Sequence, residues 1–256
     1  MSKFTILPYK QSSKSAKALA GGLACKRVLL SRRTFRHRPP NLVINWGNTG
    51  SLAGRGLHKD YVINVPEAIR LASNKLSTLR TLSRANVPTL VWTESIETAT
   101  NWLQTGNRVY SRTILSSNSG KGILISKPSE DVSVHPAPLY TLGLTNWTEW
   151  RIHASSEGQL IAIQQKVKRN ESTNDTSDIR NHGNDYIFKR NNLNIPNPEE
   201  ALKVAVVAVR ALGLHFGACD MAYLVDESAW VIIEVNTAPG LTGSTITDYV
   251  NYFKTL

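Results

Sequence analysis

Residues 212–241 read LGLHFGACDMAYLVDESAWVIIEVNTAPGL, the most strongly patterned stretch of the chain. Two apolar segments, residues 216–224 and 230–235, flank a polar turn at Asp226-Glu227. Short apolar segments bounded by turn residues are typical of β-strands, and their close spacing predicts that they pair antiparallel. The stretch therefore predicts a β-hairpin late in the chain.

Three side chains with oxygen donors interrupt these apolar strands. Glu234 and Asn236 are two residues apart and share one face of their strand, and Asp220 faces them if the strands pair through the turn. A polar edge on an exposed hairpin is the alternative, but an unpaired carboxylate within an apolar strand would be costly. Mg²⁺ prefers hard oxygen ligands and keeps positions for phosphate oxygens. We therefore expect Asp220, Glu234 and Asn236 to form a magnesium site.

The rest of the chain alternates between helices and strands. Strands are predicted at residues 4–9, 42–46, 61–65, 90–92, 108–113, 123–126, 138–142, 150–154 and 160–167. Helices are predicted at residues 15–24, 66–73, 75–85, 95–104 and 198–212, the last with Asn197 as its N-cap. This mixture predicts an α+β fold with antiparallel sheets rather than a single Rossmann unit.

Composition excludes several classes of protein. The 256 residues are 41% hydrophobic, enough for a buried core, and no apolar run approaches the roughly 20 residues that cross a bilayer. The first ten residues lack the apolar block of a secretory signal, so we expect a cytoplasmic protein with no membrane partner. Cys25 and Cys219 have no CxxC spacing, which argues against a disulfide framework and a zinc site.

The positive charge of the chain is concentrated near its start. The formal net charge is +11, and residues 1–59 hold twelve Lys and Arg residues with no Asp or Glu. A solvated basic face is one interpretation, and docking of an anionic macromolecule, either nucleic acid or an acidic protein tail, at residues 26–38 is the other. The basic residues of that segment are Lys26, Arg27, Arg32, Arg33, Arg36 and Arg38.

The two segments ALGLHFGACDMAYL and WVIIEVNTAPGLTG together resemble the C-terminal core of the ATP-grasp superfamily. The nearest branch is the one that holds the ribosomal-protein glutamate ligase and related peptide ligases. The resemblance implies that Asp220, Glu234 and Asn236 hold two magnesium ions on the phosphates of ATP. It also places the turn at residues 238–240 beside the acceptor site, and it covers roughly residues 70–250.

Further motifs follow in the order of that family. Asn74-Lys75, with Val87-Pro88 after it, resembles an element whose lysine contacts the ATP phosphates, here Lys75. The sequence SSNSGKG at residues 116–122 is similar to a glycine-rich hairpin that covers the β- and γ-phosphates. It is not a Walker A loop, because GK is not followed by Ser or Thr. The hairpin residues expected to bind nucleotide are Ser119, Gly120, Lys121 and Gly122.

Several further positions match the family's nucleotide contacts. Arg112 stands where the family usually has a strand lysine, and arginine is less compact than lysine at a phosphate. The segment PLYTL resembles the link between the two halves of the fold, where backbone groups read the adenine edge. The residues concerned are Leu139, Tyr140 and Thr141.

Three basic residues are implied to take part in catalysis. The segment EWRIH at residues 149–153 resembles a family strand, with Arg151 directed toward phosphate or substrate. Lys166 or Lys168 matches the next basic position, and we select Lys168. Arg180 would steady the transferring phosphoryl group and the oxyanion of the tetrahedral intermediate.

The resemblance implies an ATP-grasp fold in which two α+β subdomains clasp ATP, after a shortened N-terminal α/β subdomain. We expect boundaries at residues 1–70, 71–137 and 138–256. The implied activity is ATP-dependent carboxylate–amine ligation through an acylphosphate, with ATP and Mg²⁺ as cofactors and an unidentified carboxylate and amine as substrates. One alternative is a kinase or nucleotidyl-type reaction on a polyanion. The other is a non-catalytic or weakly catalytic module that binds nucleic acid or another polyanion through the basic segment.

Overall fold

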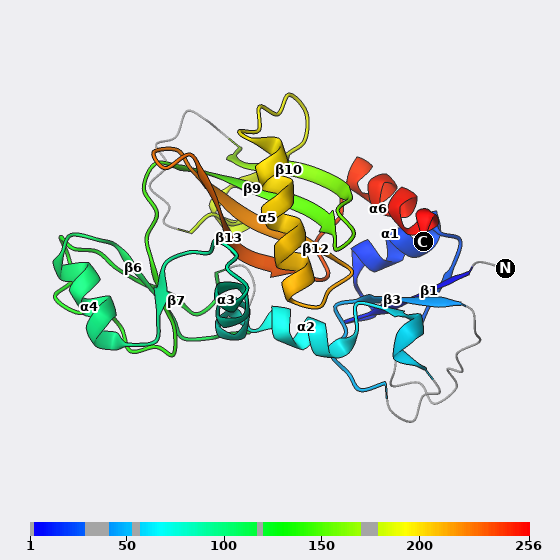
Figure 1. The fold of residues 1–256 in the computed structure, drawn as a ribbon, viewed down its shortest axis with the longest axis horizontal. Helices are drawn as coiled ribbons and strands as arrows, with labels where there is room; N and C mark the ends of the chain where they lie inside the picture. The colour runs from blue at the N-terminus through cyan, green and yellow to red at the C-terminus, as the bar shows by residue number, and fades with distance from the viewer. Residues whose placement is uncertain (1–2, 29–40, 53–56, 117–119, 170–178) are drawn as a thin grey trace.

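The computed structural model describes residues 3–28, 41–52, 57–116, 120–169 and 179–256. These residues form three sheets with flanking helices, arranged along the longest axis of the molecule (Figure 1). The antiparallel sheet with α4 lies at one end, the five-stranded sheet under α5 in the middle, and the N-terminal sheet at the other end. The α+β class predicted from the sequence is confirmed.

The N-terminal sheet is parallel throughout. Its order is β2-β1-β3-β4, with β1 at Phe4–Pro8, β2 at Lys26–Arg27, β3 at Leu42–Trp46 and β4 at Val62–Ile63. Helix α1 (Lys14–Gly22) begins at Ser13, whose hydroxyl accepts a hydrogen bond from the Ala16 N–H at 3.3 Å. The short 3₁₀ helix η1 (Lys59–Tyr61) leads into β4. Strands β1 and β2 are parallel neighbours, so the chain must cross from the end of one to the start of the other, and α1 forms that crossover.

Helices α2 (Pro66–Ser73) and α3 (Lys75–Arg84) lead to a second, antiparallel sheet. That sheet has the order β5-β8-β6-β7, with β5 at Trp92–Thr93, β6 at Val109–Arg112, β7 at Ile123–Ser126 and β8 at Tyr140–Leu142. Helix α4 (Ile96–Gln104) buries Ala99 and Leu103 against it, in a cluster with Val109 and Tyr140. Arg112 alternates with the buried Val109 and Ser111 along β6, so it belongs to the other face of this sheet.

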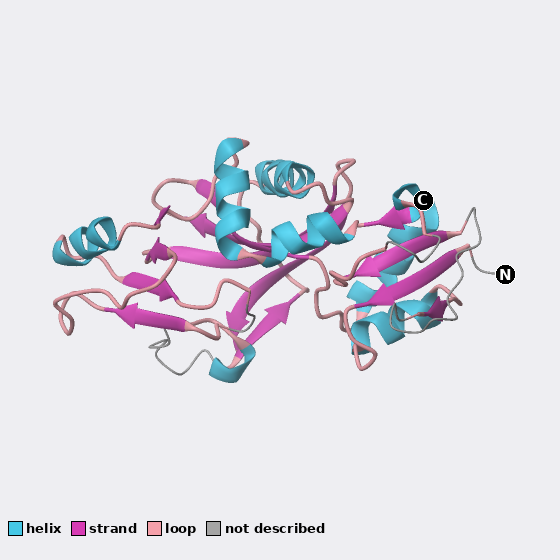
Figure 2. Ribbon diagram, turned by 90° about the horizontal axis from the view of Figure 1, so that it is seen from below, coloured by secondary structure: helices cyan, strands magenta, loops and turns pink. Residues whose placement is uncertain are grey.

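The third sheet is antiparallel and carries the strands first identified in the sequence. Its order is β11-β10-β9-β12-β13, with β9 at Trp147–Ser155, β10 at Leu160–Lys168, β11 at Tyr186–Lys189, β12 at Phe216–Leu224 and β13 at Ala229–Asn236. A short 3₁₀ helix, η2 (His182–Asn184), precedes β11. Helix α5 (Pro198–Ala211) packs on one face of this sheet, against β9, β12 and β13. Figure 2 shows helices above the central strands in that view. Under α5 lie Trp150, Ile152, Cys219 and Met221, all fully buried.

The N-terminus of α5 differs from the prediction in its details. Asn197 occupies the N-cap position, but its backbone is left-handed (φ 43°) and its side chain makes no capping hydrogen bond. Its carbonyl accepts the first intrahelical bond, from the Ala201 N–H at 3.0 Å. Pro198 is the first residue of the helix. Its lack of an N–H costs nothing there, because a backbone N–H at that position has no partner within the helix.

The chain ends in a helix that the sequence patterns did not predict. Helix α6 (Ser244–Thr255) lies beside α1, next to the N-terminal sheet (Figure 1). Its Tyr249 and Phe253 are fully buried together with Ile6 of β1 and Phe216 of β12. One apolar core thus joins the N-terminal sheet to the five-stranded sheet. Strands β2 and β11, both at sheet edges, were also not predicted.

None of the helices in the described part of the chain combines the length and apolar character needed to cross a bilayer.

Candidate active site

The face of the five-stranded sheet opposite α5 carries ionisable and amide side chains, and we call it the polar face. Strand alternation produces it, because residues that alternate with the buried apolar set point to the other side of the sheet. In register, Gln164 pairs with Arg151, Arg151 with Asp220, and Asp220 with Glu234, so the four lie in a row across four strands. The members of the polar face are Glu149, Arg151, His153, Gln164, Lys166, Asp220, Glu234 and Asn236.

A β-bulge shapes this face at its edge strand. Asp220 pairs with Glu234, whereas the next residue, Met221, pairs with Ile232, so Ile233 is the extra residue on β13. Bulges of this kind re-aim the neighbouring side chains and are common next to active sites. Here the bulge leaves Ile232 in the core and Glu234 on the polar face. The predicted pairing of Asp220 with Glu234 across the hairpin is therefore present in the structure.

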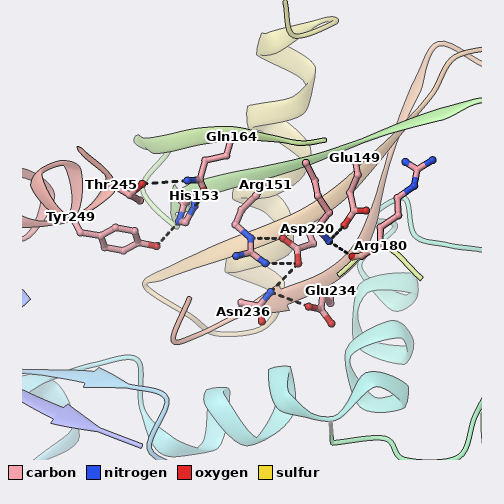
Figure 3. Close-up of polar contacts among 11 residues, drawn as sticks. Glu149, Arg151, His153, Gln164, Arg180, Asp220, Glu234, Asn236, Thr245 and Tyr249 are labelled. Carbon is pink, nitrogen blue, oxygen red and sulfur yellow. Dashed lines mark hydrogen bonds and ion pairs between the residues drawn. The ribbon is translucent and has the colours of Figure 1, made fainter. Parts of the chain in front are cut away.

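Asp220 is held by a bidentate ion pair with Arg151. The Arg151 Nε donates to Asp220 Oδ1 at 2.5 Å, and one terminal guanidinium nitrogen donates to Oδ2 at 2.7 Å (Figure 3). Asp220 is only 3% exposed. Burial works to raise the pKa of Asp220, but the Arg151 charge and its hydrogen bonds outweigh burial and hold that pKa below its usual value.

Asn236 joins the two carboxylates. Its Nδ2 donates to Asp220 Oδ2 at 3.2 Å and to Glu234 Oε1 at 3.1 Å. Burial raises the pKa of the Glu234 carboxyl, and the nearby negative charge of Asp220 raises it further. A cation placed between the two carboxylates would relieve this repulsion.

The donor set fits magnesium. Among the described residues, no cluster of three or more His, Cys, Asp and Glu side chains gathers, so a metal centre would have to use amide oxygen as well as carboxylates. Asp220, Glu234 and Asn236 provide two carboxylates and one amide on rigid strands, which are the hard oxygen donors that Mg²⁺ takes. A half-turn of the Asn236 amide presents Oδ1 where Nδ2 now lies.

A second buried ion pair lies beside the first. Lys166 donates from Nζ to a Glu149 oxygen and, at 3.0 Å, to the backbone carbonyl of Arg180. Burial raises the pKa of Glu149 to about 7, although Lys166 opposes the rise. Lys166 is thus a lysine that the structure brings to the acidic cluster. Lys168 lies two residues further along β10, opposite Tyr186, and its role stays a prediction.

Aromatic rings support the cations of this face. The Arg151 guanidinium carbon lies 4.1 Å from the ring centroid of Phe188, and that of Arg180 lies 3.9 Å from the ring centroid of Trp147. Both distances are within the range of cation–π contact. Figure 3 shows the Arg180 guanidinium directed away from Asp220, and its role at the transferring phosphoryl group stays a prediction.

Two predicted phosphate-binding residues approach from other elements. Lys75, the first residue of α3, follows the N-cap Asn74, whose side chain accepts from the Ser77 N–H at 3.0 Å. Burial lowers the pKa of Lys75, while the Glu234 charge opposes the change and Arg112 reinforces it. Burial also lowers the pKa of Arg112, again against the attraction of Glu234. Lys75, Arg112 and Glu234 are therefore close enough to interact electrostatically.

The predicted glycine-rich hairpin joins β6 to β7. Gly120 and Gly122 have φ of +75° and +77°, a region that favours glycine. A Cβ added at Gly120 would lie 2.7 Å from the Ile179 side chain, so this turn contacts the segment that carries Arg180. Lys121 lies between the two glycines, and Ser119 is outside the described residues.

The segment predicted to read adenine forms an interior strand. Leu139, Tyr140 and Thr141 are fully buried, and β8 pairs with β5 on one side and β6 on the other. The Leu139 carbonyl accepts from the Arg112 N–H at 2.8 Å. The Thr141 hydroxyl accepts from Arg112 Nε at 3.4 Å. This segment therefore positions Arg112, and its contact with adenine stays a prediction.

His153 and Tyr249 form a buried hydrogen bond that no spacing in the sequence predicts. Of the basic segment, Lys26 and Arg27 form β2, while Arg32, Arg33, Arg36 and Arg38 lie outside the described residues.

Comparison with known proteins places the fold. No protein-family model and no curated protein matches the sequence. The ATP-grasp ligase PsnB, complexed with minimal precursor, Mg and ADP, is similar over 99% of this chain and 97% of its own, with a TM-score of 0.67 and 13% identity. The D-alanine–D-alanine ligase from Bacillus anthracis is similar over 98% and 92%, with a TM-score of 0.62 and 13% identity.

A third similar structure is D-alanyl-alanine synthetase A from Vibrio cholerae, over 97% of this chain and 93% of its own, with a TM-score of 0.63 and 15% identity. Identities this low show the fold alone. The chain has the ATP-grasp fold, over nearly its whole length. The particular branch named from the sequence stays a prediction.

Proposed function

We propose that the protein is an ATP-dependent carboxylate–amine ligase that works through an acylphosphate and releases ADP and phosphate. The observation that carries this proposal is the convergence of Asp220, Glu234 and Asn236 on the polar face, within electrostatic reach of Lys75 and Arg112. The β12–β13 hairpin thus provides oxygen ligands, and α3 and β6 each provide one cation proposed to bind phosphate.

Asp220, Glu234 and Asn236 would hold magnesium, which when bound neutralises phosphate charge and polarises the transferred phosphoryl group. Lys75 and Arg112 would bind phosphate oxygens from the opposite side. Both are partly desolvated, so their charges act through a medium of lower effective dielectric than water. The protein's contribution is positioning and charge neutralisation.

Arg180 is proposed to steady the transferring phosphoryl group and the oxyanion of the tetrahedral intermediate, and Lys168 to be a further basic residue of the same site. The Gly120 turn contacts Ile179, next to Arg180, so the hairpin and the Arg180 segment are placed to close over the same region. Exclusion of water there would protect an acylphosphate from hydrolysis. The solved structures support this use of the fold, since PsnB is described with Mg and ADP and the B. anthracis ligase with ATP.

The proposal is tested by product analysis. The protein is incubated with MgATP and panels of carboxylates and amines, and ADP, phosphate and amide are measured by coupled assay and mass spectrometry. We expect all three products together, because the acylphosphate route couples them. ADP with a phosphorylated polyanion and no amide would indicate the kinase alternative instead.

A matched pair of variants links turnover to the site. Glu234→Gln should lower turnover by at least about 100-fold, the loss typical when one group that stabilises transition-state charge is removed. Glu227→Gln, an exposed acid on the turn of the same hairpin, should leave turnover unchanged. Equal turnover of the two variants would contradict the proposed metal site.

A further inference from the structure

The carboxylate proposed as a magnesium ligand already has a positive partner in the structure. Both Asp220 oxygens accept N–H groups of Arg151, at 2.5 and 2.7 Å, and Oδ2 also accepts from Asn236. N–H donors therefore occupy the directions from which a metal would approach Asp220. The fork of a guanidinium matches both oxygens of a carboxylate at once, so this pairing is specific as well as strong.

Arg151 is firmly placed. Its side chain is 12% exposed, and its guanidinium stacks on Phe188 at 4.1 Å. It comes from β9, in direct register with Asp220 on β12, so the backbone ladder itself brings the two side chains together. This ion pair is built into the sheet.

Burial of the acidic pair explains why a cation must be present. Asp220, which is buried, and Glu234, which is half-buried, lie side by side on neighbouring strands, and this pair without a counter-charge would destabilise the fold. Arg151 supplies that charge. A divalent cation bound by the same oxygens would provide it equally well, so the two cations are alternatives at Asp220.

We propose that Arg151 is the resident counter-cation of Asp220, which divalent metal must displace, and that the displaced guanidinium is taken up by the phosphates of the nucleotide. The inference rests on the proposed function and deepens it. The planar fork suits phosphate as well as carboxylate, and the phosphates would lie over the same face. Arg151 thereby opposes binding of metal alone and favours binding of metal together with nucleotide.

The test measures binding of Mn²⁺ alone, without nucleotide, by the electron paramagnetic resonance of free Mn²⁺. Mn²⁺ takes the same oxygen ligands as Mg²⁺. Arg151→Met should bind Mn²⁺ at least about fivefold more tightly than the wild type, at the lower end of coupling between interacting sites. Arg190→Met is the matched control, since it removes another partly buried arginine, which pairs with Asp248 instead. It should bind Mn²⁺ as the wild type does.

Thermal unfolding provides a second readout. Arg151→Met leaves Asp220 without its counter-charge, so Mn²⁺ should raise its Tm by more than it raises that of the wild type. If Arg151→Met does not fold, Arg151→Lys decides, because a lysine presents one point charge and cannot hold both oxygens. It should bind Mn²⁺ more tightly than the wild type.

Two results would overturn the inference in different ways. If Glu234→Gln weakens Mn²⁺ binding but the Arg151 variants bind it no more tightly than the wild type, the metal site stands and the role of Arg151 is wrong. If Glu234→Gln leaves Mn²⁺ binding unchanged, the metal site itself is wrong. The proposed function then fails with it.

Discussion

At the scale of single residues, His153 shows how the polar face is kept neutral where it meets α6. The ring is fully buried, two residues from Arg151 on β9. Its Nδ1 lies 2.9 Å from the Tyr249 hydroxyl and its Nε2 lies 3.2 Å from Gln164 Oε1. Burial, together with the Arg151 charge, lowers the pKa of His153 from 6.5 to about 3.

This pKa predicts an acid-sensitive fold. Between pH 6.5 and about 3 the unfolded chain binds a proton at His153 and the folded chain does not, so the free energy of unfolding falls as pH falls. The free energy of unfolding falls by at most about 1.4 kcal/mol for each pH unit below 6.5, and this contribution of His153 to stability is fully present above pH 6.5. Urea unfolding measured from pH 7 to 4 gives the free energy of unfolding as a function of pH. The slope of that curve should be smaller in His153→Gln than in the wild type, by the amount that corresponds to about one bound proton.

The exposed His135 provides the control, because His135→Gln should keep the wild-type slope. Parallel slopes for His153→Gln and the wild type would show that His153 takes up a proton as readily in the folded protein as in the unfolded chain.

At the scale of elements, the β6–β7 hairpin of the proposed nucleotide site leaves little space for an added methyl group at Gly120. Gly120 combines a left-handed backbone with a contact to Ile179, whereas Gly158 has a similarly positive φ of +99° and open space around it. Substituting alanine at each of the two glycines therefore distinguishes the effect of backbone strain, which both share, from the loss of a tertiary contact, which only Gly120 makes.

We expect Gly120→Ala to displace the turn from Ile179 and to weaken nucleotide-dependent ordering. Hydrogen exchange with and without a non-hydrolysable ATP analogue is the measurement. In the wild type the analogue should raise protection at residues 120–123, because the backbone N–H groups of the turn would contact phosphate. Gly120→Ala should lose most of that gain.

Gly158→Ala should cost about 1–2 kcal/mol for its left-handed backbone and keep the nucleotide-dependent protection. If protection at residues 120–123 does not respond to nucleotide in the wild type, the hairpin has no phosphate-covering role.

At the scale of the whole molecule, α6 contributes to the apolar core that the N-terminal sheet shares with the five-stranded sheet. Phe253 of α6 is fully buried, with its ring centroid 5.3 Å from that of Phe216 on β12. Leu19 of α1 belongs to the same core. The N-terminal sheet therefore shares its apolar core with the sheet that carries the proposed metal site.

Phe253→Ala should destabilise both regions at once, by about 3–5 kcal/mol, the usual cost of emptying a buried Phe site. Denaturant unfolding followed by hydrogen exchange in both sheets should give one shared transition in the wild type, shifted as a unit in the variant. Leu256→Ala, at a 44% exposed position one residue beyond the same helix, should change stability by less than about 0.5 kcal/mol. Loss of protection in the N-terminal sheet alone would show that the two regions unfold independently.

Sequence alone determined the hairpin, because apolar strands joined by a short polar turn depend on local rules. An unbroken register from that turn would place Ile233 opposite Asp220, and the bulge at Ile233 brings Glu234 there instead. The glycines at positions 120 and 122 were identifiable for the same reason, since a tight turn favours residues that tolerate positive φ.

Only the tertiary structure decided which cations meet those acids. Arg151 and Asp220 are 69 positions apart, and their pairing requires β9 to lie beside β12, which no local pattern specifies. The same holds for Lys166, which the sequence did not separate from Lys168. Helix α6 is the clearest case at the level of an element. Its sequence, STITDYVNYFKT, is rich in β-branched and aromatic residues with weak intrinsic helix preference, and it is helical because burial of Tyr249 and Phe253 in the shared core outweighs that preference.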